Sequence, residues 1–141
     1  MSEYLEFYAK HNTDENMFIP LGTFCRSNLT FQSFRDFVPS YAVVEPLNKE
    51  VLGTVRQEVE DTIKRYKKYI KEEKKEIKSV EGKYSLSEFI EYKNERKSCI
   101  NEIKEDIKSL RYVEYFTSFL EDIDAEIWCG IECELPEGAK V

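Results

Sequence analysis

Residues 59–78, with the sequence VEDTIKRYKKYIKEEKKEIK, decide the fold of this chain. Apolar residues recur in this stretch at alternating spacings of four and three, and Glu73 fills the one vacant place, which is the pattern of a heptad-like helical seam. The seam consists of Val59, Ile63, Tyr66, Ile70 and Ile77. It predicts one helix from about residue 48 to about residue 80, which at about 1.5 Å per residue is on the order of 48 Å long. A helix of this length must project from the domain or pair with another helix.

A second helix is predicted after Gly82, which breaks the first pattern. Ser85 or Ser87 can cap this helix, and Ser85 followed three residues later by Glu88 matches a capping box at a helix start. An apolar seam then runs through Phe89, Ile100, Ile103, Ile107, Leu110, Val113, Phe116, Leu120 and Ile123. The two helices are expected to form an antiparallel hairpin, with its tip near Gly82 and its base near Asn48 and Ile123.

Both ends of the chain show the period of β-strands. Residues 4–9 alternate between apolar and polar, and a polar turn separates them from the apolar run 17–21, which predicts a hairpin. Pro20 cannot donate to a ladder, so it belongs at an edge or an end of the sheet. Residues 127–135 also alternate, which predicts a last strand that rejoins the N-terminal sheet. The residues on its apolar face are Ile127, Cys129, Ile131, Cys133 and Leu135.

The segment between these regions predicts small elements. Residues 23–26 could extend the sheet, and Ser27 or Asn28 could cap a short helix that Pro39 ends. That helix would carry Leu29, Phe31, Phe34 and Phe37. Residues 41–44 form a short β-prone run.

Together these elements predict an α+β fold, with an N-terminal antiparallel sheet, a C-terminal strand that joins it, and a long two-helix hairpin. The length of 141 residues fits a single domain over residues 1–141. Within it we expect a β-rich region in residues 1–46, the two helices in residues 47–124, and the last strand and tail in residues 125–141.

Composition limits the classes of function. The chain has 28 acidic and 21 basic residues and a net charge of −7, so we expect it to repel polymeric nucleic acid. A hydrophobic content of 41% with 13% aromatic residues predicts a folded protein. No stretch is apolar enough to suggest a signal peptide or a membrane span, so we expect a cytoplasmic protein with reduced cysteines.

The sequence does not suggest catalysis. His11, the one histidine, lies in a predicted polar turn without an orienting partner nearby. Cys129 and Cys133 do not reach a convincing zinc spacing, and buried thiols are the better interpretation. The five glycines are scattered, which argues against a phosphate-binding loop. We therefore expect a protein that is not an enzyme, with no metal and no cofactor.

Arginines at apolar positions are the first candidates for binding. Arg56 lies three residues before Val59 and Arg96 lies four residues before Ile100, so each interrupts a helical seam. A guanidinium in a helix interface needs a carboxylate, carbonyl groups or a bound anion. One interpretation is an interhelical ion pair with a glutamate, and the other is an anion pocket that grips phosphate oxygens. Arg111 could do the same near the sheet.

Aromatic residues near the hairpin tip are the second candidates. Tyr84, Phe89 and Tyr92 are clustered in sequence beside Asn94. Aromatic faces stack on bases, and an amide can read a purine edge or a ribose hydroxyl. The alternative is an aromatic plug against a helix turn or a neighbouring subunit.

These features together resemble the phage-encoded Thoeris anti-defence proteins of the first type. The similarity spans most of the chain and lies in residues 4–8 (YLEFY), residues 21–27 (LGTFCRS), the two-helix body, and Tyr84 followed ten residues later by Asn94. The resemblance implies a non-enzymatic sponge that binds cyclic ADP-ribose isomers, the signals of bacterial TIR-domain enzymes, without degrading them. It would thereby keep the signal from the Thoeris effector in the cytoplasm of an infected bacterium.

The resemblance also implies roles for particular residues. Tyr84 takes the place of a phenylalanine that stacks on the nucleotide, and Asn94 takes that of a hydrogen-bonding amide. Arg56 and Arg111 match arginines of a second site for cyclic oligonucleotides. Members of the family form dimers that assemble into hexamers. The alternative function is an acidic helical interaction protein that inhibits or docks onto a protein partner.

Overall fold

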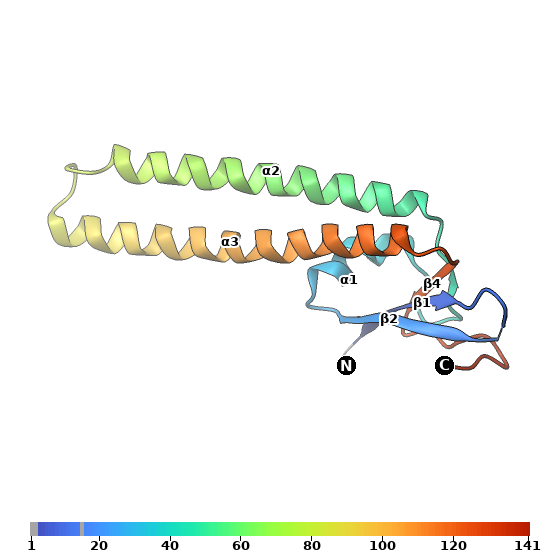
Figure 1. The fold of residues 1–141 in the computed structure, drawn as a ribbon. Helices are drawn as coiled ribbons and strands as arrows, with labels where there is room; N and C mark the ends of the chain where they lie inside the picture. Colours follow the sequence, from blue (N-terminus) through green and yellow to red (C-terminus); the bar gives the residue numbers. More distant parts are fainter. Residues whose placement is uncertain (1–2, 15) are drawn as a thin grey trace.

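A computed structural model describes residues 3–14 and 16–141 (Figure 1). A long helical hairpin projects from one end of a small sheet. The strands are β1 (Tyr4–Lys10), β2 (Phe18–Cys25), β3 (Glu45–Pro46) and β4 (Ile127–Ile131). The helices are α1 (Leu29–Phe34), the short 3-10 helix η1 (Arg35–Phe37), α2 (Glu50–Ser79) and α3 (Leu86–Asp122). The predicted α+β fold is confirmed.

The sheet joins the two ends of the chain. Its strand order is β2-β1-β4-β3, and each neighbouring pair is antiparallel. The central strand β1 turns Leu5, Phe7 and Ala9 inward, as its alternation predicts. Pro20 lies in β2, which is an edge strand of the sheet. Proline is tolerated in an edge strand because one side of that strand has no neighbouring strand to receive a hydrogen bond. The return of β4 to the N-terminal sheet is confirmed.

The helices α2 and α3 run antiparallel and side by side along their length (Figure 1). Ser85 is the N-cap residue of α3, and its hydroxyl accepts a hydrogen bond from the backbone N–H of Glu88 at 3.4 Å. Gly82 has a φ of +82° at the tip, a left-handed conformation that glycine adopts without strain. At the base, Lys49 Nζ donates to the carbonyl oxygen of Ile123 at 2.7 Å. The predicted tip and base of the hairpin are confirmed.

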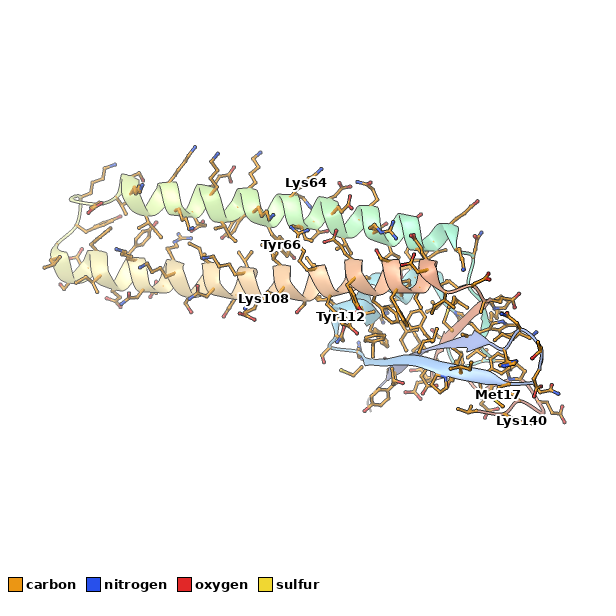
Figure 2. All side chains as sticks on the ribbon, in the orientation of Figure 1. Met17, Lys64, Tyr66, Lys108, Tyr112 and Lys140 are labelled. Carbon is orange, nitrogen blue, oxygen red and sulfur yellow. The ribbon has the colours of Figure 1, made fainter. Side chains whose placement is uncertain are left out.

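The core lies where the base of the hairpin meets α1 and the sheet. The ring of Phe7 makes edge-on contacts with three other rings, with centroid distances of 6.0, 5.1 and 5.1 Å to Phe24, Phe34 and Phe116 respectively. Such ring contacts stabilise the fold beyond what the burial of their apolar area alone contributes. Figure 2 shows Tyr66 between the two helices, where it packs partly buried against the core, and Tyr112 where α3 meets the sheet. Asn28 is the residue that caps α1, because its Oδ1 accepts from the N–H of Thr30 at 2.8 Å.

The β-prone run 41–44 begins at a turn, where Tyr41 adopts a φ of +55°, and Val43 forms a single β-bridge with Glu134 before the short strand β3 at Glu45–Pro46. One local prediction was wrong. The last strand stops at Ile131, because Glu132 adopts a φ of +49°. Cys133 therefore folds back over the strand, and a Cβ at Gly130 would lie 2.5 Å from its Sγ. In the described part of the chain, no helix combines the length and apolar character needed to cross a membrane.

Candidate functional site

A lysine-lined groove runs between α2 and α3 near the tip of the hairpin. Its volume is about 660 Å³, which is in the range of small-molecule sites. Apolar side chains of Ile77, Phe89 and Ile100 contribute to its lining. Its polar residues are Lys74, Lys78, Glu81, Lys93, Lys97, Asn101 and Lys104. The groove therefore offers a concentration of positive charge on a chain whose net charge is −7.

The groove lysines lack acidic neighbours on their own helices. Lys74, Lys93, Lys97 and Lys104 have no Asp or Glu three or four residues away on either side, although the chain is rich in acidic residues; Lys78 has Glu81. Among residues 3–14 and 16–141, none of the five forms an ion pair. Like charges four residues apart on a helix repel each other, so the groove is suited to an anion.

Phe89 supplies an aromatic surface to the groove. Its ring is half-buried, and the ammonium group of Lys93 lies 5.9 Å from the ring centroid. Such a ring can stack on a planar heterocycle while the neighbouring lysine contacts an anionic group. Phe89 is thus the predicted site residue that the structure places in the groove.

Tyr84 and Asn94 lie on different sides of α3. Tyr84 is 51% exposed and packs against Tyr92, with 6.3 Å between ring centroids. Asn94 is exposed, three residues before Lys97 and seven before Asn101, so helical spacing places it on the groove side. Residues two positions apart in a helix point in nearly opposite directions, which separates Asn94 from Tyr92 and its partner Tyr84. The structure therefore brings Tyr84 and Tyr92 together, but does not bring Asn94 to them within one chain.

Arg96 forms an ion pair across the hairpin. Its Nη1 lies 3.2 Å from Glu73 Oε2, and its guanidinium lies 5.3 Å from the centre of the Tyr92 ring. The adjacent Glu73 carboxylate is the main reason that the pKa of Arg96 is raised. It is also the first cause of the raised pKa of Tyr69. Glu73 and Arg96 are the polar residues that interrupt the two helical seams, and each thus provides the charged partner of the other.

Arg56 and Arg111 lie toward the base and are engaged differently. Arg56 Nη2 lies against Glu121 Oε1 as an interhelical ion pair, but neither its Nε nor its Nη2 has a hydrogen bond to any residue that the structure describes. Arg111 Nη1 lies 2.9 Å from Glu114 Oε1 on the same helix. Arg111 lines a small groove of about 260 Å³ together with Glu60, Ile63, Lys64, Lys67 and Glu114. The ion-pair interpretation therefore describes Arg56 and Arg96 in this structure.

The histidine and cysteines take structural positions. His11 Nδ1 accepts hydrogen bonds from the backbone N–H groups of Thr13 and Asp14 at 3.2 and 3.0 Å, which stabilises the turn. Burial raises the pKa of the Cys129 thiol to about 12, so this group is protonated and poorly reactive. Cys25 is exposed, and a hydrogen bond with Ser27 is the main cause of its lowered pKa. Within the described ranges, no three His, Cys, Asp or Glu residues are grouped so as to hold a metal ion.

Sequence analysis missed the groove lysines as a site. The signal was present, because the neighbours three and four residues from Lys74, Lys93, Lys97 and Lys104 are apolar, amide or basic instead of acidic. That signal gains meaning only when both helices are placed, since lysines of α2 and α3 line one groove. Comparisons with protein-family models, with curated proteins and with solved structures found no match to this chain.

Proposed function

We propose that this protein is a non-enzymatic binding protein that captures a cyclic ADP-ribose-type signal made by bacterial TIR-domain enzymes. It holds the signal unaltered and so keeps it from the Thoeris effector, in the cytoplasm of a phage-infected bacterium. The observation that carries the proposal is the lysine-lined groove with Phe89 in its wall, on an otherwise acidic chain.

The chemistry of the groove matches the chemistry of such a ligand. Ammonium groups attract phosphate oxygens, the Phe89 ring can stack on a purine, and the Asn101 amide can donate to or accept from a ribose hydroxyl. The resemblance implies that dimers assemble into a hexamer. In that assembly, Tyr84 and Asn94 of neighbouring chains complete the contacts to the bound ligand. Arg56 and Arg111 are the candidates for a second site that takes cyclic oligonucleotides.

Capture and release test the proposal. The purified protein is incubated with a cyclic ADP-ribose isomer, freed of unbound ligand and then denatured, and the released compound is analysed by mass spectrometry. We expect intact ligand in an amount comparable to that of the protein. At ligand a hundredfold above Kd, binding should stabilise the fold by about 2.7 kcal/mol, which a thermal shift detects. Release of an altered compound would show catalysis, and absence of retained ligand would contradict capture.

Matched variants locate the site. Phe89→Leu keeps apolar volume but removes the ring, and should lower affinity about tenfold, since stacking on a base contributes about 1–3 kcal/mol. Tyr115→Leu is the control, because Tyr115 is an exposed α3 aromatic outside the groove lining. The double variant Tyr84→Ala with Asn94→Ala tests the residues that the resemblance implies. If it retains ligand as well as the parent, those two residues do not form the site.

The second candidate function is docking of a protein partner, and an exposed aromatic face on α3 favours it. Tyr112, Tyr115 and Phe119 are 47%, 68% and 39% exposed. Phe119 also lines an apolar depression of about 550 Å³ with Ile19 and other residues of β1 and β2. A net charge of −7 suits a basic partner with apolar side chains at its surface. In that case nucleotides produce no thermal shift, and Tyr115→Ser weakens partner binding.

A further inference from the structure

We propose that the groove selects its ligand through a diphosphate group, held between one lysine pair on α2 and one on α3. The pairs are Lys74 with Lys78 and Lys93 with Lys97. This inference rests on the proposed function in that it takes the groove as the ligand site. It goes further because it names the chemical group that is recognised and the four side chains that recognise it.

The register of the hairpin places the lysines in two opposed rungs. The Arg96–Glu73 ion pair, at 3.2 Å, indicates which residues of the antiparallel helices lie at about the same level. Lys97 and Lys74 each follow this pair by one residue; because the helices are antiparallel, they lie on opposite sides of its level, about 3 Å apart along the axes, and both line the groove. Lys93 and Lys78 form a second rung one turn nearer the tip, at about 6 Å along the axes given about 1.5 Å per residue.

Two rungs fit two linked phosphate groups. A diphosphate presents neighbouring anionic groups on a short bridge, so each phosphate can meet lysines from both helices. A monophosphate meets one rung and leaves the other rung's charges uncompensated. The repulsion within each pair, four residues apart on one helix, is relieved most by an anion that contacts both pairs. Selection by charge number follows from this arrangement.

The ligand would also connect the two helices in a part of the hairpin that the core cluster does not reach. Ile77 and Ile100 are buried here, but both lie outside the main core cluster. A diphosphate that contacts lysines of α2 and α3 adds interhelical contacts at this level. Bound ligand should therefore slow amide hydrogen exchange around residues 74–78 and 93–97 more than elsewhere in the hairpin.

Inorganic pyrophosphate and orthophosphate test the inference on the full chain. Titration calorimetry at one ionic strength should show pyrophosphate binding at least about tenfold more tightly than orthophosphate. Replacing one rung, with Lys74→Gln and Lys97→Gln together, should weaken pyrophosphate binding about tenfold or more. The control is Lys75→Gln with Lys108→Gln, which removes the same charge from the same two helices outside the groove lining and should change the affinity less than about twofold.

The outcomes separate this inference from the proposed function. Glutamine is a good helix former, and circular dichroism checks that both double variants keep their helices. Equal affinities for the two phosphates, or equal losses in the rung and control variants, would overturn diphosphate recognition even if a cyclic ADP-ribose isomer is retained. Tight pyrophosphate binding that the rung variant loses supports the inference, and it does so even if the isomer fails to bind and the proposed function is wrong.

Discussion

The base and the tip of the helical hairpin are built from the same two helices but are packed in different ways. At the base, α2 and α3 contribute eight buried residues to the core cluster, namely Leu52, Val55, Val59, Ile63, Leu110, Val113, Phe116 and Leu120. Toward the tip, Ile77 and Ile100 are buried apart from that cluster, and the ion pair of Glu73 with Arg96 takes seam positions. Stability is thus concentrated at the base, and the lysine groove lies in the part of the hairpin that the core does not reach.

This difference indicates how a small chain can carry a binding site without weakening its fold. Repelling lysines next to the core would reduce stability where the whole domain depends on it. Near the tip they affect only the pairing of two helices, whose local opening leaves the core intact. The two halves of the hairpin should therefore be energetically distinct, and substitutions in each half can reveal the difference.

The largest effect is expected at the base. Phe7→Ala should lower the free energy of unfolding by about 4 kcal/mol, because it removes a fully buried ring packed against three other rings. Urea denaturation followed by circular dichroism measures this loss. Tyr115→Ala, an exposed position, should change it by less than about 0.5 kcal/mol. A loss below about 1 kcal/mol for Phe7→Ala would show that the core is not where the stability lies.

A matched pair of substitutions on α3 compares the halves directly. Leu110 and Ile100 are similarly buried, at 6% and 4% exposed, but only Leu110 belongs to the core cluster. Leu110→Ala should cost about 3 kcal/mol, and Ile100→Ala at least about 1 kcal/mol less, because two helices outside the core cluster can close around the lost volume more easily than the core can. In the Ile100→Ala variant, amide hydrogen exchange should accelerate only near the tip of the hairpin. Equal losses with global acceleration in both variants would mean that the hairpin unfolds as one unit.

The buried thiol of the sheet predicts a pH effect. Burial raises the pKa of Cys129 from 9.0 to about 12, so the folded state keeps a proton that the unfolded chain loses. This contribution to stability is complete below about pH 9 and is lost as the pH rises toward about 12. The free energy of unfolding should therefore fall as the pH rises above about 9. Cys129→Ala should reduce that fall, whereas Cys99→Ala, at an exposed thiol, should leave it unchanged.

The smallest effect is expected for the ion pair between Arg56 and Glu121 near the base. Both side chains are partly exposed, at 29% and 36%, so water screens part of their attraction, although the Arg56 Nη2 atom that faces Glu121 is itself buried. A double-mutant cycle with Arg56→Met and Glu121→Gln should give a coupling energy of at most about 1 kcal/mol. A coupling well above that value would place part of the stability of the hairpin in this pair and weaken the contrast between apolar base and polar tip.

Much of the fold follows from local patterns. The seam from Val59 to Ile77 predicts α2, the Ser85 cap predicts the start of α3, and the alternation in residues 4–9 predicts β1; each agrees with the structure. These features depend on neighbours within a few residues, which the sequence shows directly. The wrong prediction, a last strand that continues past Ile131, falls where Glu132 adopts a left-handed conformation and turns the chain against its β pattern.

The amino-acid sequence by itself determined the two long helices, the turn between them and the α+β class, because helical and strand periods are local properties of the chain. Only the tertiary structure decided that Arg96 meets Glu73, that Tyr84 packs against Tyr92, and that lysines of two helices line one groove. The physical reason is that these relations depend on the register and rotation of one helix against the other. Packing along the whole interface sets both.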